Sequence, residues 1–444
     1  MCKNIVLIPN NTDLNRGDEA LVWESIELIK DIYGNNVHIS IIGPTDDTEE
    51  AILQTRQTKK MGYKILESPL RHPGRFAEEN DIHYSKRILL RWGWVAIKDF
   101  FFSSMLLSNI SPIFNFAYKH LDGKQKQTYK EIVNADAIYV KGGGFIHSYG
   151  GITDAYKIYY QLYLISLSQK FKKDVYILPN SIGPLKNRIA FYLTKKVLGK
   201  CKLITTRERI SQDFVQSIGL RAYKFPDLGF YLKPSCNDFA DYLSKHGVDL
   251  RKKNVLITLR PYRFEGSSNP TELYRNYEKC ILNTIRFLVS KGYGVTLFAH
   301  TLGPSAHEDD RKALLGVMKK LPSSIRSKVV YISDVELTCR DVEKIYSYYD
   351  YLIGTRFHSV IFALNVNVPA IAIAYGGNKG KGIMEDLNNN EYSVDMDKLQ
   401  ENSLIEILNV LFLNRENYLG NMRLCRDSIN HQRNELITLI KSLL

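Results

Sequence analysis

Short apolar runs alternate with amphipathic stretches along the first half of the chain. Residues 4–8 and 37–42 are apolar runs typical of buried strands. The segment after Gly17 has helical periodicity, with one apolar face made of Leu21, Val22, Ile26 and Ile29. Further strands are predicted at 137–140, 175–178 and 203–206, with helices at 154–171 and 188–198. This alternation predicts a parallel sheet with helices on both faces.

The same alternation begins again in the second half. Strands are predicted at 255–259, 295–298, 329–332, 351–353 and 369–374, and helices at 271–290, after Glu308 and at 342–349. A polar segment at 233–253, which contains Pro234 and Ser235, separates the halves. Because 444 residues exceed one ordinary core, we expect two Rossmann-like α/β domains that face a cleft. Their expected bounds are 1–235 and 250–444.

Residues 85–121 depart from this rhythm and predict one or two aromatic-rich helices inserted in the first domain. The segment contains Trp92, Trp94 and three consecutive phenylalanines at 100–102. A helical cap over the sheet or an oligomer contact is the favoured interpretation. The alternative is a peripheral membrane contact, which the flanking Lys86, Arg87, Arg91 and Lys98 support.

Charge and cysteine spacing narrow the classes of partner. The formal net charge of +13 favours anionic partners. It is spread along the chain without a nucleic-acid-binding signature, so no nucleic acid partner is expected. The six cysteines form no CxxC pair, so we expect no metal site and a reducing cytoplasmic location. The N-terminal residues read as a first strand and not as a signal peptide, and no apolar stretch is long enough to span a membrane.

Candidate binding residues follow the predicted strands of the first domain, because open parallel sheets bind ligands at the carboxyl ends of their strands. Asn15 and Asp18 lie in the polar loop after the first strand and could either cap the helix or bind sugar hydroxyls. Gly142, Gly143 and Gly144 lack Cβ atoms and would let a ligand approach their backbone amides.

Two further strand ends in this domain carry polar side chains. Asn180 and Ser181 follow the strand 175–178, and Arg207 follows the strand 203–206. A buried arginine needs an anion. Glu208 could be that anion, or a substrate phosphate or carboxylate could match the planar guanidinium.

The strongest site signal lies in the second domain. Arg356 and His358 are two residues apart after the strand 351–353, and Ser359 opens a helix whose dipole favours an anion. Lys379 lies in a glycine-rich segment after the strand 369–374, where a solvated turn is the alternative. Arg260 and His300 each end another strand of this domain.

Taken in order, these positions resemble the polysaccharide pyruvyl transferase family. The matching pieces are Asn15 with Gly17-Asp18-Glu19-Ala20, Gly142-Gly143-Gly144, Asn180-Ser181-Ile182-Gly183-Pro184, Arg207-Glu208 with Ser211, Asp227, Arg356-Phe357-His358, and Tyr375 with Lys379. They extend over about residues 5–390, nearly the whole chain.

The resemblance implies a GT-B-like pair of domains in which 250–444 holds the donor and 1–235 largely holds the sugar acceptor. It implies phosphoenolpyruvate as co-substrate, with no metal and no other cofactor. The activity implied is transfer of the enolpyruvyl group, as a ketal, to a sugar of a bacterial-type surface polysaccharide or its lipid-linked precursor. That reaction releases phosphate and would take place in the cytoplasm or at the inner face of the membrane.

We assign roles by hypothesis. Arg207, Arg356 and Lys379 would bind the two anionic groups of the donor. His358 would be the acid or a phosphate partner, and Asp18 would orient or deprotonate the acceptor. The main alternative is a nucleotide-sugar glycosyltransferase of the same architecture, with Glu385 or Asp386 on the ribose. A non-catalytic glycan- or membrane-binding subunit is a second alternative.

Overall fold

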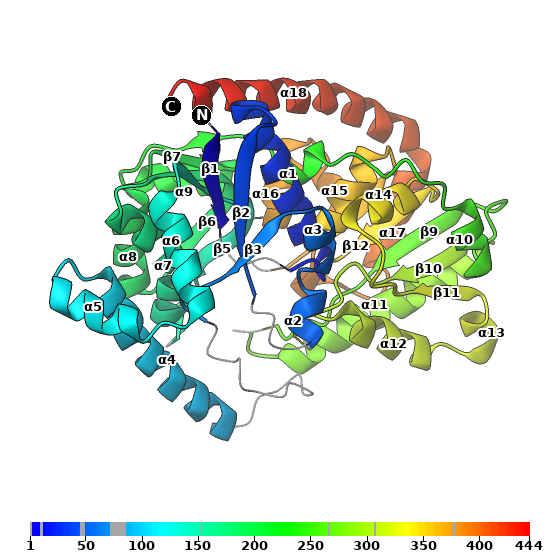
Figure 1. Cartoon of the computed structure of the whole chain (residues 1–444). Helices are drawn as coiled ribbons and strands as arrows, with labels where there is room; N and C mark the ends of the chain where they lie inside the picture. Colours follow the sequence, from blue (N-terminus) through cyan, green and yellow to red (C-terminus); the bar gives the residue numbers. More distant parts are fainter. Residues whose placement is uncertain are drawn as a thin grey trace. The chain divides into compact units, whose positions relative to one another are not determined.

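The computed structural model describes residues 2–8, 12–44, 49–71, 86–151, 153–264, 267–305, 308–375 and 379–444. The chain forms two compact units (Figure 1). The first comprises Met1–Asp13, Leu21–Asp227 and Arg433–Leu444, and the second comprises Leu14–Ala20 and Leu228–Gln432.

The first unit is built on a parallel sheet. In its described part this sheet has eight strands, in the order β3-β2-β1-β4-β6-β7-β8, with β5 paired to β6. The strands are β1 (Lys3–Ile8), β2 (Val37–Gly43), β3 (Lys64–Glu67), β4 (Ala137–Val140), β5 (Gly143–Ser148), β6 (Asp174–Leu185), β7 (Leu203–Thr206) and β8 (Tyr223–Lys224). The helices are α1 (Arg16–Tyr33), α2 (Glu49–Leu53), α3 (Arg56–Lys60), α4 (Lys86–Leu107), α5 (Ser111–Lys119), α6 (Gly123–Asn134), α7 (Asp154–Lys170), α8 (Arg188–Leu198) and α9 (Arg209–Ser217). The part of α1 before Leu21 belongs to the second unit.

Apolar residues on neighbouring strands form the core of this unit. Val6 of β1, Ile138 of β4 and Ile177 of β6 are buried in one cluster with Leu162 and Ile165 of α7. All four residues of β4 are buried, as expected for a central strand covered on both faces. The parallel sheet predicted from the apolar runs is confirmed.

The glycine-rich segment after β4 differs from its predicted form. The sequence predicts no strand there, whereas Gly143 begins the strand β5, which pairs in parallel with β6. This pairing is available because β6 continues beyond the predicted strand 175–178 to Leu185. Asn180 and Ser181 therefore lie within a strand. The register between β6 and β7 shifts between Ile177 and Asn180, next to Pro179, which has no N–H for the ladder.

The second unit also contains a parallel sheet. Its described strands follow the order β11-β10-β9-β12-β13-β14. These strands are β9 (Asn254–Thr258), β10 (Gly294–Phe298), β11 (Val329–Ile332), β12 (Tyr351–Gly354), β13 (Ala370–Ala374) and β14 (Ser393–Asp395). The helices are η2 (Leu228–Tyr231), α10 (Ala240–Lys245), α11 (Pro270–Ser290), α12 (Asp310–Lys320), α13 (Ser323–Arg326), α14 (Cys339–Tyr346), α15 (Phe357–Asn365), α16 (Lys379–Asp386), η3 (Asn390–Tyr392), η4 (Met396–Lys398), α17 (Ser403–Leu413) and α18 (Arg415–Lys441). The part of α18 from Arg433 onward belongs to the first unit.

The second unit begins earlier than the polar segment 233–253. Asn365 Nδ2 donates to the carbonyl oxygen of Gly229 at 2.8 Å, and the Tyr231 hydroxyl donates to the carbonyl oxygen of Ile429 at 3.0 Å. These bonds join η2 to α15 and α18. The division between the units therefore falls after Asp227.

Candidate functional site

The sheet of the second unit reverses its strand order beside β9. Strands β10 and β11 lie on one side of β9, and β12, β13 and β14 lie on the other. Ligands of open α/β sheets bind outside the carboxyl ends of the strands at such a reversal. Arg260 follows β9, and Arg356 follows its hydrogen-bonded neighbour β12. The topology thus places these two predicted residues at one edge of the sheet.

Arg356 is held by two carboxylates. Its Nε donates to Asp310 Oδ1 at 2.9 Å, and its Nη1 donates to Glu308 Oε2 at 2.7 Å. Burial lowers the pKa of Arg356, but the charges of Asp310 and Glu308 outweigh burial and raise the pKa. Burial raises the pKa of Asp310 to about 6, although the Arg356 charge opposes this change. The guanidinium is therefore charged, buried and paired.

Arg260 shares one of these carboxylates. Its Nη2 lies 3.4 Å from Glu308 Oε1, so each oxygen of Glu308 faces a different arginine. The Arg260 guanidinium also lies 4.0 Å from the ring centroid of Tyr375, which follows β13, a distance typical of cation–π contact. The Glu308 side chain is 33% exposed. Two guanidinium groups, which suit carboxylates and phosphates, thus flank one accessible carboxylate.

His358 packs directly on the backbone of Gly17. A methyl group at Gly17 would overlap the His358 ring and would lie 2.6 Å from His358 Cβ. His358 is in the first turn of α15, where the helix dipole favours negative charge. Glycine is therefore required at position 17. Because Asp18 directly follows Gly17, the contact also brings Asp18 near His358, which is 340 positions later in the chain.

Asn15 and Asp18 complete the first turn of α1. Asn15 Oδ1 accepts the backbone N–H of Gly17 at 3.1 Å, as in an N-cap. Asn15 Nδ2 donates to Asp18 Oδ2 at 3.1 Å. Both side chains remain partly exposed. The capping interpretation accounts for these contacts, and sugar binding by the two residues stays a prediction.

A buried ion pair connects this turn to α14 of the second unit. Arg16 Nη1 lies 3.5 Å from Glu19 Oε2, and Arg16 Nη2 donates to the carbonyl oxygen of Asp334 at 3.0 Å. Glu19 Oε2 accepts the backbone N–H of Cys339 at 2.9 Å, at the start of α14. Glu19 thus supports the N-terminus of a distant helix. These contacts explain why Leu14–Ala20 belongs to the second unit.

The Gly17→Ala variant should displace His358, because the new methyl group overlaps the imidazole. With the role as acid or phosphate partner that the sequence predicts for His358, we expect a loss of activity of about a hundredfold, which is the scale of a displacement of about 1 Å in the bound geometry. Steady-state kinetics measures this loss. The control is Gly316→Ala in α12, where an added methyl group meets no atom within 4 Å. A Gly17→Ala enzyme as active as this control would contradict the contact.

The first unit holds a second predicted arginine in a buried network. The Arg207 side chain is 0% exposed. Its Nη1 donates to Asp227 Oδ2 at 2.6 Å, and its Nε donates to Ser181 Oγ at 2.7 Å. Its Nη2 has no hydrogen-bond partner among the described residues. A methyl group at exposed Gly144 would lie 2.5 Å from this Nη2. The Nη2 atom of Arg207 therefore lies next to the backbone of the exposed Gly144.

Glu208 completes this network. Ser181 Oγ donates to Glu208 Oε2 at 2.9 Å, and Ser211 donates to Oε1. Burial raises the pKa of Glu208, and the charge of Arg207, 3.7 Å away, only partly offsets this effect. Arg207 thus meets protein carboxylates on one side, as one of the two sequence interpretations expects. A contact between its Nη2 and a substrate stays a prediction.

The side chain of Asn180 forms a hydrogen bond at the start of the glycine-rich segment. The amide Nδ2 donates to the carbonyl oxygens of Lys141 at 2.8 Å and Leu178 at 2.9 Å. Gly143 faces Asn180 in the register of β5 and β6. Asn180 is fully buried, so the structure gives it a role in positioning this segment.

His300 and Lys379 are two further residues that the sequence predicts to bind substrate. His300 is 1% exposed, and its Nδ1 lies 2.9 Å from the Tyr346 hydroxyl while its ring packs on Phe362. These internal contacts hold the end of β10, and a substrate contact by His300 stays a prediction. Lys379 begins α16, but its side chain lies outside the described part of the chain.

The sequence interpretation missed Glu308 and Asp310. In the sequence, both residues belong to an acidic cluster at the start of a predicted helix. Helix capping accounts for such a cluster without a ligand-binding site. Their proximity to Arg356 depends on the sheet topology. Among the described residues, no group of three or more His, Cys, Asp or Glu side chains could hold a metal ion. None of the described helices is long and apolar enough to cross a membrane.

Comparison with known proteins gives a family match. A family model described as polysaccharide pyruvyl transferase matches residues 15–377. The amylovoran biosynthesis protein AmsJ of Erwinia amylovora is 23% identical over 433 residues, which cover 93% of this chain and 92% of AmsJ.

Solved structures of low sequence identity share the fold. UDP-GlcNAc 2-epimerase from Neisseria meningitidis, bound to UDP-GlcNAc, matches with a TM-score of 0.56 and 11% identity, covering 99% of this chain and 100% of the epimerase. Trehalose-6-phosphate synthase OtsA matches with a TM-score of 0.53 and 11% identity, covering 100% of both chains. The predicted fold class, two Rossmann-like α/β domains of the GT-B-like type, is confirmed.

Proposed function

Because this chain belongs to the polysaccharide pyruvyl transferase family, we propose that it transfers the enolpyruvyl group of phosphoenolpyruvate to a sugar as a cyclic ketal. The acceptor would be a surface polysaccharide or its lipid-linked precursor. The relative AmsJ is named for amylovoran biosynthesis, which supports a place in polysaccharide synthesis. The cytoplasm, where phosphoenolpyruvate is made, would be the site of the reaction.

The observation that carries the donor assignment is the arginine pair at the strand reversal. Arg260 and Arg356 face the two oxygens of Glu308. Phosphoenolpyruvate carries a carboxylate and a phosphate, and either group could replace the partly exposed Glu308 carboxylate between the two guanidinium groups. The N-terminus of α15 would add a favourable dipole. Lys379, at the start of α16, would provide a further cation.

The chemistry would proceed from protonation of the donor. His358 would give a proton to the methylene carbon of phosphoenolpyruvate, which leaves a cationic centre at the adjacent carbon. A sugar hydroxyl would attack that carbon and lose its proton to Asp18. Phosphate would then leave with the electrons of its C–O bond, and a second sugar hydroxyl would close the ketal and lose its proton to His358, which restores the acid. Positioned acid and base groups of this kind each contribute about 10²–10⁴-fold to rates.

The first unit would contribute acceptor contacts. Gly144 exposes its backbone, and the open Nη2 of Arg207 lies behind it. We propose that this nitrogen donates to an oxygen of the substrate. Asp227 and Glu208 would keep the guanidinium oriented for that bond.

Ligand binding separates this proposal from a nucleotide-sugar glycosyltransferase. Phosphoenolpyruvate at about 100 times its Kd should stabilise the folded protein by about 2.7 kcal/mol. UDP-glucose and UDP-GlcNAc at the same concentration should have no effect. Thermal unfolding with each ligand measures the difference. Stabilisation by the UDP-sugars and none by phosphoenolpyruvate would favour the glycosyltransferase.

A further inference from the structure

The outer face of α4 carries an exposed apolar stripe. Leu90, Trp94, Ile97 and Phe101 follow the spacing i, i+4, i+7 and i+11, so they lie on one side of the helix. Their exposed fractions are 76%, 72%, 52% and 60%. Ile110, Ile113 and Phe116, at the start of and within α5, are also exposed. We call these seven residues the apolar stripe. Exposed apolar surfaces rimmed by polar residues mark interaction sites.

A row of basic residues runs along one flank of the stripe. Arg87, Arg91 and Lys98 follow the spacing i, i+4 and i+11, and all three are exposed. Residues 86–121 contain five Lys or Arg residues and a single acidic residue, Asp99. The surface therefore combines aromatic and aliphatic side chains with adjacent positive charge, which is the composition of helices that lie in the interface of anionic membranes.

The opposite faces of α4 and α5 are anchored to the first unit. The Tyr159 hydroxyl of α7 lies 2.7 Å from Ser103 Oγ of α4. Lys170 Nζ donates to the carbonyl oxygens of Leu106 and Ser108 at 2.7 Å and lies 4.0 Å from the ring centroid of Phe114. These contacts hold the end of α4 and the start of α5 on α7.

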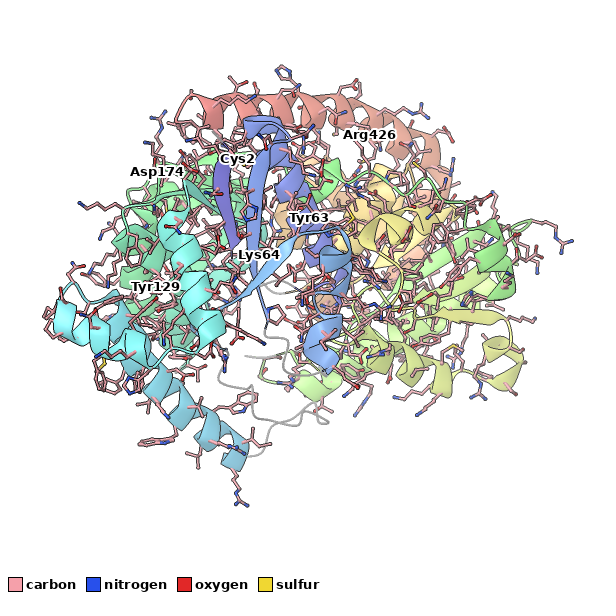
Figure 2. All side chains as sticks on the ribbon, viewed as in Figure 1. Cys2, Tyr63, Lys64, Tyr129, Asp174 and Arg426 are labelled. Carbon is pink, nitrogen blue, oxygen red and sulfur yellow. The ribbon has the colours of Figure 1, made fainter. Side chains whose placement is uncertain are left out.

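Helix α6 secures α5 in the same way. Tyr129 projects from α6 (Figure 2), and its ring packs against Phe114 and Tyr118 of α5. The inner faces of both helices are therefore occupied by their own unit. The apolar stripe is presented outward and is not needed to complete that core.

We infer that α4 and α5 dock on the surface of an anionic lipid bilayer, with the apolar stripe inserted among the headgroups and the basic row against lipid phosphates. Charge favours lipid over a second copy of the chain, because a second copy would bring another basic row toward the first. None of the described helices could span a membrane, so the contact would be peripheral. This inference does not depend on the proposed chemistry.

Trp94 provides a direct spectroscopic test. Of the three tryptophans, Trp23 is buried, whereas Trp94 is 72% exposed. Vesicles of phosphatidylcholine with phosphatidylglycerol should sediment the full-length protein and shift its tryptophan emission to shorter wavelength. Vesicles of phosphatidylcholine alone should bind it more weakly. The Trp94→Phe variant should still sediment but should lose most of the emission shift.

Variants of the two surface features complete the test. Trp94→Ser with Phe101→Ser should weaken vesicle binding by about tenfold or more, because the inserted apolar area is removed. Arg91→Glu with Lys98→Glu should abolish the preference for phosphatidylglycerol. The control, Leu413→Ser with Leu424→Ser, changes two exposed leucines of α17 and α18 and should bind as the wild type does. Circular dichroism confirms that each variant is folded.

Three results would overturn the inference. The first is absence of vesicle binding by the wild type. The second is equal loss of binding in the control and in the Trp94/Phe101 variant. The third is a dimer in light scattering that the Trp94/Phe101 variant converts to a monomer, without vesicle binding, which would assign the stripe to a second copy.

Discussion

The His358→Ala enzyme is expected to turn over about 10²–10⁴-fold more slowly than the wild type while it keeps its fold. The reason is that the proposed proton donor is removed, and general acids contribute rate enhancements of this size. His358 packs on Gly17 beside Asp18, so the alanine leaves a space at the start of α15 without unpairing Arg356. Phosphoenolpyruvate turnover measures the effect, and circular dichroism measures the fold.

The control for this variant is His246→Ala. His246 is an exposed histidine of the second unit, and its Nδ1 lies 2.8 Å from the carbonyl oxygen of Tyr242. Its replacement should leave turnover unchanged. If His358→Ala retained the rate of this control, the assignment of His358 as the acid would be wrong. Retained phosphoenolpyruvate binding together with lost turnover would separate an acid from a residue that only binds phosphate.

Replacement of Arg356 with alanine should lower the free energy of unfolding of the second unit by about 3–5 kcal/mol. Removal of one partner from a buried ion pair leaves the other charge uncompensated. Here the remaining charge is Asp310, which is fully buried and loses the donor at 2.9 Å. Urea unfolding followed by fluorescence measures the change. The variant should also lose affinity for phosphoenolpyruvate.

Two controls test the reason for this loss. In the double variant Arg356→Ala with Asp310→Asn, the buried carboxylate is absent, so the destabilisation should be smaller than the sum of the two single changes. Arg251, which pairs with Asp249 at the surface, should have no measurable effect on stability when it is replaced by alanine. An Arg356→Ala protein as stable as the Arg251→Ala protein would contradict the account of the buried pair.

The fold class and most strands could be predicted from the sequence because each central strand is a short apolar run bounded by polar residues. The predicted run 137–140 coincides with β4, and 203–206 coincides with β7. Strand β5 could not be predicted in this way. Its glycines resemble a loop, and its pairing depends on the length of β6, which is a non-local property.

The candidate site was predictable in its residue types and only partly in its contacts. Arg356 and His358 stand out because charged residues directly follow a buried strand. The contact between Gly17 and His358 joins positions 341 residues apart, and no local pattern encodes it. Glu308 was missed for the same reason. An acidic residue before a helix has an ordinary capping explanation, and only the sheet order brings it to the two arginines.

The central claim is ketal formation from phosphoenolpyruvate, and the most direct measurement uses glycans extracted from cells that lack this protein as acceptors. The purified enzyme and phosphoenolpyruvate should release phosphate and add pyruvate ketal in equal amounts, by phosphate assay and mass spectrometry, and His358→Ala should do neither. If these glycans gained no ketal, or instead gained a sugar from a UDP-sugar with release of UDP, the claim would be contradicted.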